Sequence, residues 1–92
     1  MKAPEALREI MRKLEAGETF GRVYPHRLGG NYFSPVLYLT PSGLIGWSHY
    51  GSSANKRTLS DLAWILREIF KLTPEEFTAQ HTLRSEYEAA ND

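Results

Sequence analysis

The chain has 92 residues, which suits one small domain (residues 1–92), and it contains 11 Lys and Arg against 11 Asp and Glu. The formal net charge of zero disfavours a dedicated DNA-binding domain, because such domains usually carry a clearly basic total. The absence of cysteine excludes a disulfide framework, thiol catalysis and cysteine-ligated zinc.

The sequence has no long apolar segment. A membrane-spanning helix needs a run of about 18 apolar residues, and no such run occurs. The N-terminal segment MKAPEALREI lacks the hydrophobic core of a secretion signal. We therefore expect a soluble, cytoplasmic protein that does not bind a membrane.

Charged and aromatic residues are unevenly distributed along the chain. Residues 1–57 contain eight Lys and Arg against four acids, whereas residues 58–92 contain three against seven. No Asp or Glu occurs between Thr19 and Ser60, and seven of the eleven aromatic residues lie in this segment. A cationic, aromatic segment without acids is typical of a surface that binds an anionic or polar partner.

The N-terminal third predicts a helix followed by a strand. Apolar residues at helical spacing, after a proline that suits a first turn and before a glycine, predict a helix over about residues 4–16. The alternating segment FGRVY predicts a strand over residues 20–24 that ends at Pro25. Residues 28–31 then predict a turn or loop.

The clearest local signal is a β-hairpin formed by residues 35–40 and 44–50. Its connection, Thr40-Pro41-Ser42-Gly43, predicts a type I turn with a glycine bulge. In the resulting register Thr40 faces Leu44, and one apolar face forms from Leu37, Leu39, Ile45 and Trp47. The other face carries Val36, Tyr38, Thr40, Leu44, Gly46, Ser48 and Tyr50.

Two helices are predicted after the hairpin. The first spans about residues 58–71, with Thr58 as N-cap and Asp61 three residues later. The second spans residues 73–92 and begins with Thr73, Pro74 and Glu76 in the positions of a capping box. Its apolar content is thin, so we expect its last turns to fray or to need a partner.

These elements predict an α+β fold. A small three-stranded antiparallel sheet is preceded by one helix and followed by two, in the order α-β-β-β-α-α.

The segment between the hairpin and the next helix is a candidate anion or phosphate site. Ser52, Ser53, Lys56 and Arg57 lie where the chain leaves a strand and enters a helix, and a helix N-terminus attracts anions. The segment resembles the phosphate-binding Walker A loop, but Asn55 replaces the second glycine of that loop and Arg57 replaces its magnesium-binding hydroxyl. We expect a simple anion contact at most, and a polar loop with solvated cations is the alternative.

No catalytic, metal-binding or cofactor-binding set is predicted. His26, His49 and His81 are far apart in the sequence and form no H-x-x-x-H pair. Serines 52 and 53 lie near His49, but a G-x-S-x-G elbow is absent and the predicted sheet face has no pair of carboxylates. We therefore expect a protein that is not an enzyme.

The main candidate for partner binding is aromatic and cationic. If the strands adjoin, Tyr38 and Tyr50 lie near Arg22, Tyr24 and the basic pair at residues 56–57. Such a face suits single-stranded nucleic acid, through stacking and phosphate contacts, and it equally suits a protein interface. The alternative is that the first or the third helix covers this face as a second core layer.

Trp64 is a separate candidate, because helical spacing places it on the polar side of its helix. A tryptophan there is either buried by another part of the chain or belongs to an interface. A homodimer through the Trp64 face is one such interface.

These residues support two functions. The first is a non-catalytic protein-binding regulator or inhibitor that occludes a macromolecular partner. A short chain without cysteine, metal or cofactor motifs is typical of an accessory protein of a phage or mobile element that acts on a host complex. The second is a small nucleic-acid-binding module that uses the sheet face and the basic loop. Its element order resembles that of AP2-type and integrase arm-binding domains, but the hairpin here carries no Arg or Lys.

Overall fold

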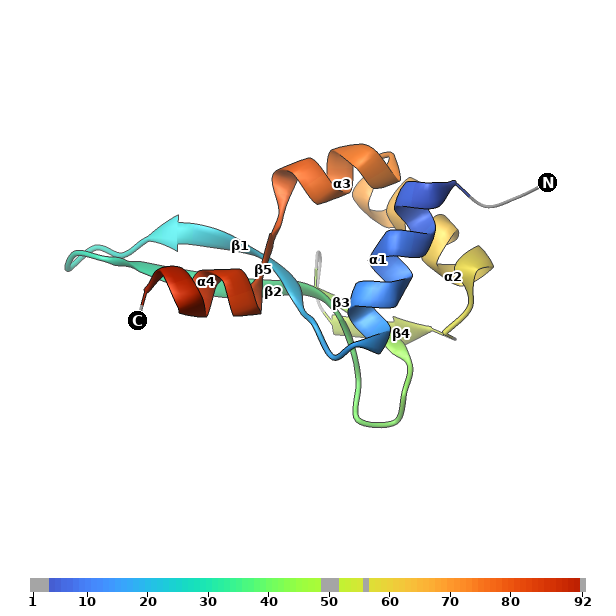
Figure 1. Cartoon of the computed structure of the whole chain (residues 1–92), viewed down its shortest axis with the longest axis horizontal. Helices are drawn as coiled ribbons and strands as arrows, with labels where there is room; N and C mark the ends of the chain where they lie inside the picture. The colour runs from blue at the N-terminus through green and yellow to red at the C-terminus, as the bar shows by residue number, and fades with distance from the viewer. Residues whose placement is uncertain (1–3, 49–51, 56, 92) are drawn as a thin grey trace.

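The computed structural model describes residues 4–48, the backbone of residues 52–55, and residues 57–91. The fold is α+β, as predicted (Figure 1). Its helices are α1 (Glu5–Glu15), α2 (Leu59–Trp64), the π-helix η1 (Ile65–Phe70), α3 (Pro74–Gln80) and α4 (Arg84–Ala90). Its strands are β1 (Phe20–Pro25), β2 (Asn31–Leu39), β3 (Ile45–Ser48), β4 (Ser52–Asn55) and β5 (Thr82–Leu83).

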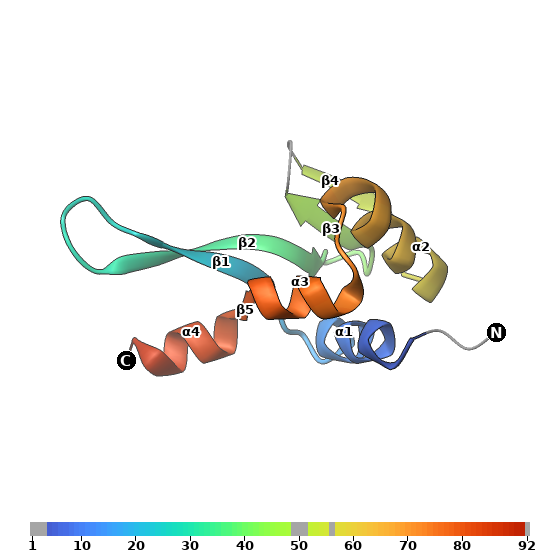
Figure 2. The ribbon, with the colours of Figure 1, turned by 90° about the horizontal axis from the view of Figure 1, so that it is seen from above.

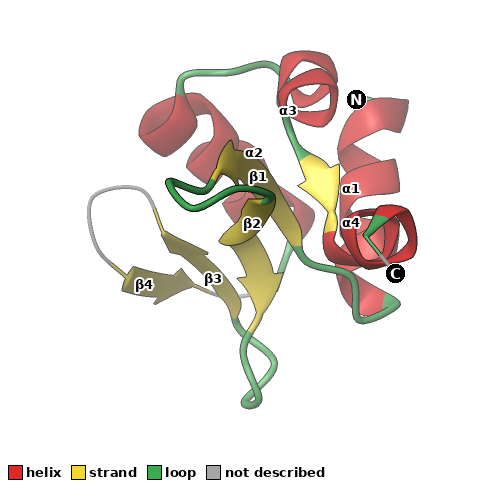
Figure 3. Ribbon diagram, turned by 90° about the vertical axis from the view of Figure 1, so that its left-hand side faces the viewer, coloured by secondary structure: helices red, strands yellow, loops and turns green. Residues whose placement is uncertain are grey.

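The sheet contains the three predicted strands and two further ones. The strands lie in the order β4-β3-β2-β1-β5, and each neighbouring pair is antiparallel (Figure 3). β4 forms where the sequence predicted a loop before the next helix. β5 is only two residues long, and it pairs with the start of β1 through Phe20–Leu83 and Gly21–Thr82.

The segment predicted as one helix over residues 73–92 forms α3 and α4 with β5 between them. Its N-terminal signal is confirmed, because Thr73 and Glu76 form a full capping box. The helix ends because His81 takes up extended backbone angles and the next two residues pair with β1. The apolar residues of this segment therefore serve different elements: Phe77 is buried under α3, and Leu83 packs against the core from β5.

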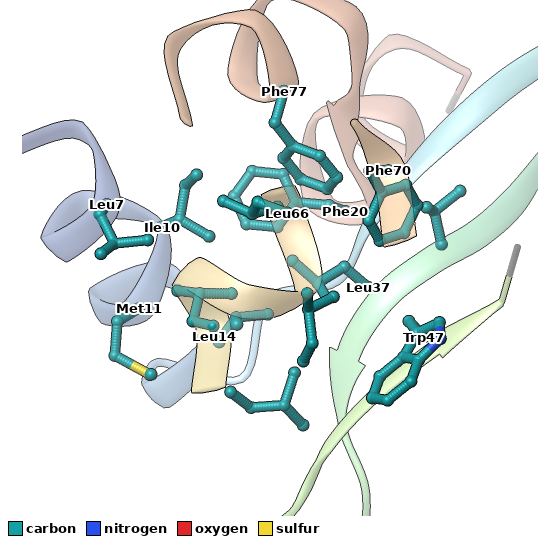
Figure 4. Packing of buried hydrophobic residues seen from close by; sticks show 14 residues of the cluster. Leu7, Ile10, Met11, Leu14, Phe20, Leu37, Trp47, Leu66, Phe70 and Phe77 are labelled. Atoms are coloured by element: carbon teal, nitrogen blue, oxygen red, sulfur yellow. The ribbon is translucent and has the colours of Figure 1, made fainter. Parts of the chain in front are cut away.

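The core lies between the helices and the base of the sheet (Figure 4). The predicted stripe of α1 is buried, and α2 and η1 form the predicted helix of residues 58–71 with Thr58 as its N-cap. η1 ends where Lys71 adopts a left-handed conformation, with φ of 59°, and the Leu72 N–H donates to the Leu66 carbonyl oxygen. This bond spans one residue more than the corresponding bond of a Schellman cap, because the helix that it ends has π-helical spacing.

The predicted register of the β2–β3 hairpin is confirmed. Leu37 faces Trp47, Tyr38 faces Gly46, and Leu39 faces Ile45. The turn is closed by a hydrogen bond from the Gly43 N–H to the Thr40 carbonyl oxygen. Gly43 has a φ of +83°, as the glycine bulge requires.

A β-bulge in β2 changes which side chains share a face. Phe20 pairs with Leu37 while Gly21 pairs with Pro35, so Val36 is an extra residue in β2. Val36 and Leu37 are consequently both buried in the core. The prediction that Val36 shares the outer face with Tyr38 is therefore wrong, because the bulge interrupts the two-residue alternation on which that prediction depended.

Candidate binding site

The distal parts of β1 and β2 form a two-stranded arm, defined here as residues 22–34. The arm extends away from α1, α2 and α3, with α4 beside it, and the molecule measures 47 by 25 by 24 Å along its principal axes (Figures 1 and 2). Its strands pair through Arg22–Ser34, Val23–Phe33, Tyr24–Tyr32 and Pro25–Asn31. The arm contains no acidic residue.

One face of the arm carries a pair of exposed tyrosines. The rings of Tyr24 and Tyr32 lie 5.7 Å apart between centroids, and their side chains are 40% and 46% exposed. The His26 ring meets Tyr32 edge-on at 6.2 Å. Because cross-strand aromatic pairs support each other in a hairpin, the arm holds both tyrosines in place while leaving much of each ring open to solvent.

The tip of the arm is built by a compact loop. The His26 N–H donates to the Gly30 carbonyl oxygen, and the Leu28 N–H donates to Nδ1 of His26. Leu28 is 92% exposed at the end of the loop. A shallow hollow of about 530 Å³ lies beside the loop and is lined by Pro25, His26, Arg27 and Tyr32.

The opposite face of the arm is covered by α4. The Tyr87 ring lies 5.5 Å from the Phe33 ring, and the Arg84 guanidinium lies 5.0 Å above Phe33. The Tyr87 hydroxyl donates to the Asn31 carbonyl oxygen at 3.0 Å. These contacts support the arm from one side, so the Tyr24–Tyr32 face is its open side.

The base of the arm is joined through His81 to the helical body, defined here as α1, α2, η1 and α3 with the part of the sheet that they cover. Nε2 of His81 accepts a hydrogen bond of 3.2 Å from Nε of Arg22, so its Nδ1 carries the proton and donates to the Phe77 carbonyl oxygen at 2.7 Å. The ring also stacks on Phe77 at 4.0 Å. Burial lowers the pKa of His81 below its usual 6.5, and the Arg22 cation lowers it further, although the Phe77 carbonyl opposes both effects.

The structure does not gather the predicted aromatic residues on one face. Tyr24 lies on the open face of the arm, with Arg22 at its base. Tyr38 lies on the other face of the sheet, where a hollow is lined by Tyr38, Pro35 and Arg84 of α4. The bulge at Val36 and the alternation of β2 together produce this separation. Tyr50 lies outside the described residues.

The predicted basic loop is also arranged differently. Ser52 and Ser53 belong to β4 and pair with Ser48 and Trp47 of β3. Lys56 lies outside the described residues, and Arg57 is exposed beside α2. The N-terminus of α2 is capped internally, because Thr58 accepts a hydrogen bond from the Asp61 N–H and the Asp61 carboxylate lies in the first turn. Anion binding by these four residues stays a prediction.

Trp64 is the last residue of α2 and is 41% exposed. Helix α2 lies at the opposite end of the molecule from the arm (Figure 1). The place of Trp64 on the polar side of the helix agrees with the spacing argument, and its role at an interface stays a prediction. Within the described ranges, no three His, Cys, Asp or Glu side chains lie close enough to hold a metal ion.

Four residues of this candidate site were not predicted as site residues: Tyr32, His26, Arg27 and Leu28. The sequence carries a signal for the hairpin, because a Gly-Gly pair between two strand-like runs is typical of a hairpin connection. It does not give the register. A two-residue Gly29-Gly30 loop would place Tyr24 opposite Pro35, whereas the connection is centred on Leu28 and Tyr24 pairs with Tyr32.

No helix in the described part of the chain is long and apolar enough to span a membrane. In comparisons with known proteins, the chain matches no family model, no curated protein and no solved structure.

Proposed function

We propose that the chain is a non-catalytic protein-binding regulator or inhibitor that uses its arm to occlude an acidic surface of a partner protein. The observation that carries this proposal is the open face of the arm, where Tyr24 and Tyr32 lie half exposed beside the exposed tip residues Arg27 and Leu28. Tyrosine and arginine are the side chains that most often dominate the binding energy of protein interfaces.

The charge of the arm indicates the chemistry of the partner. Arg22, Arg27 and His26 are its ionisable groups besides the tyrosines, and it has no carboxylate to repel an acidic partner. Complementary charge speeds the encounter of two proteins and selects the partner, while the tyrosine rings provide the buried contact area.

A protein suits the arm better than a nucleic acid. Nucleic-acid affinity depends on many phosphate contacts from Lys and Arg. The arm has two arginines, and Arg22 already donates to His81 at its base. An extended two-stranded ribbon with a protruding apolar tip instead fits a groove between the elements of a partner protein. A small nucleic-acid-binding module remains the alternative, and an origin in a phage or mobile element stays a prediction.

The test is affinity capture from a lysate of the source cell with three immobilised forms of the protein. These are the wild type, Tyr24→Ala/Tyr32→Ala, and Trp64→Ala as the matched control at the other end of the molecule. We expect the wild type and Trp64→Ala to retain the same stoichiometric protein. We expect the arm variant to bind it at least about 30-fold more weakly, because two central tyrosines are lost.

Two controls separate the outcomes. Melting temperatures of all three forms establish that the arm variant is folded. Labelled single-stranded DNA and RNA, titrated at low and high salt, test the alternative, since phosphate contacts give steep salt dependence. Equal capture by the arm variant, or tight salt-dependent nucleic-acid binding that the arm variant loses, would overturn the proposal.

A further inference from the structure

A second candidate surface lies at the opposite end of the molecule from the arm. An open groove of about 530 Å³ runs between the start of α1, the helix formed by α2 and η1, and the start of α3. Its walls are largely apolar and come from Pro4, Leu7, Ala63, Leu66, Leu72 and Pro74. The volume lies within the range of grooves and pockets that bind ligands.

The groove is a consequence of how the chain ends one helix and begins the next. Lys71 turns the chain with its left-handed conformation, and the Leu72 N–H closes the cap on the Leu66 carbonyl oxygen. Leu72 is thereby directed back against the core, and Pro74 starts α3 two residues later. A π-helix borders the groove, and such helices are frequent at functional sites.

The charged side chains that line the groove differ in whether they already have a partner within the protein. Arg67 is paired with Glu68 at 2.9 Å. The Glu76 carboxylate accepts a hydrogen bond of 2.8 Å from the Thr73 N–H, so it serves the capping box of α3. Within residues 4–48 and 57–91, Lys71 forms no ion pair and is exposed at the rim. The groove therefore combines apolar walls with the exposed cation Lys71, which is unpaired within these ranges.

We propose that this groove binds an amphipathic helix of a partner protein, with apolar side chains along one face and an Asp or Glu beside them that pairs with Lys71. A groove between helices is a common seat for such a segment. The groove is partly open to solvent, which suits a helix whose outer face is polar and stays in water. This surface is separate from the arm, so the inference does not rest on the proposed function.

The test uses two labelled peptides of about 14 residues, near the shortest length at which an isolated helix is viable. Both present leucines at helical spacing, and they differ only in flanking Glu or flanking Lys residues. Fluorescence anisotropy measures binding to the wild type, Lys71→Glu, Lys71→Gln and Tyr32→Ala. We expect the wild type and Tyr32→Ala to prefer the Glu peptide, and Lys71→Glu to weaken it about five- to tenfold while gaining affinity for the Lys peptide.

Amide chemical shifts of the isotopically labelled protein locate the bound peptide. We expect shifts at Ala63, Leu72 and Thr73, with the amides of the arm unchanged. Lys71→Gln is expected to lie between the wild type and Lys71→Glu, which separates the charge from any effect on the helix cap. Absence of binding to the Glu peptide, equal affinity for both peptides, or shifts confined to other residues would each overturn the inference.

Discussion

Strands β1 and β2 run through both the helical body and the arm, but their apolar side chains are buried in the body and exposed on the arm. At the base of the sheet, Phe20, Val36 and Leu37 are buried under the helices. A few residues farther along the same strands, Val23, Tyr24 and Tyr32 are exposed, and the tip presents Leu28. Four of the six exposed large hydrophobic residues in the described part of the chain lie on the arm. The apolar side chains of the body therefore stabilise the fold, whereas those of the arm remain accessible to a partner.

We expect the largest loss of stability from a substitution at Phe77 in the body. Phe77 is fully buried, and its ring contacts Phe20, Phe70 and His81. Phe77→Ala should lower the free energy of unfolding by about 3–5 kcal/mol, because it removes buried area and leaves a cavity. Tyr32→Ala on the arm should lower it by less than about 1 kcal/mol, which is the range of one cross-strand pair. Urea denaturation followed by tryptophan fluorescence measures both values.

Phe77→Leu serves as a milder variant if Phe77→Ala is unfolded under all conditions. Similar shifts of the midpoint of urea denaturation in the Phe77 variant and in Tyr32→Ala would contradict the proposed difference between body and arm. In that case the arm tyrosines contribute to the core, and their exposure is not a sign of binding.

A second prediction concerns Gly21, where body and arm meet. A Cβ atom added to Gly21 would overlap the Ser34 carbonyl oxygen and the Phe33 ring. At Gly46 it would meet mainly the Tyr38 ring, a side chain that can move. Gly21→Ala should therefore destabilise the protein by about 1–3 kcal/mol, and Gly46→Ala by less, because only the first displaces backbone. Thermal unfolding of both variants measures the difference.

Gly21→Ala also tests how the arm is attached. Nuclear Overhauser effects between the ring protons of Phe33 and Tyr87 report whether α4 still covers the arm. An equal loss of stability in the two glycine variants would show that the junction adapts as easily as the site of Gly46 in β3.

The body was more predictable from the sequence than the arm because its signals are local. Thr58 with Asp61, and Thr73 with Glu76, define helix starts through side chains three residues apart, and the turn before Gly43 sets the register of its hairpin. These signals are confirmed. The order of one helix, three strands and further helices follows from them.

The remaining features depend on contacts that no local pattern encodes. The bulge at Val36 follows from satisfying the core and the β1 pairing together, and it separates Tyr38 from Tyr24. β4 consists of small polar residues without apolar alternation, so it reads as a loop. β5 interrupts a helical pattern because the open edge of β1 offers Thr82 and Leu83 hydrogen-bond partners. Each is a case in which tertiary pairing overrides local preference.

The smallest predicted effect lies at His81, the hydrogen-bonded link between arm and body. Only the neutral ring can accept from Arg22 while donating to Phe77, and its pKa is lowered below 6.5 in the folded protein. The unfolded chain therefore binds the proton more readily. The stability that His81 contributes is fully present above about pH 6.5 and is lost as the pH falls through the lower folded-state pKa. Melting temperatures between about pH 7.5 and 5 measure this loss.

The difference between wild type and His81→Gln isolates this contribution from that of the other charged side chains around the adjoining hollow, which are Glu9, Lys13 and Glu86. Glutamine offers Arg22 an acceptor but does not titrate, so its melting curve should fall less steeply with acid. His26→Gln, at the exposed tip, is the matched control for removal of an imidazole. Parallel curves for wild type and His81→Gln would mean that the arm is held to the body by packing alone. A shallower curve for His81→Gln would place a titrating contact at the junction of the two regions.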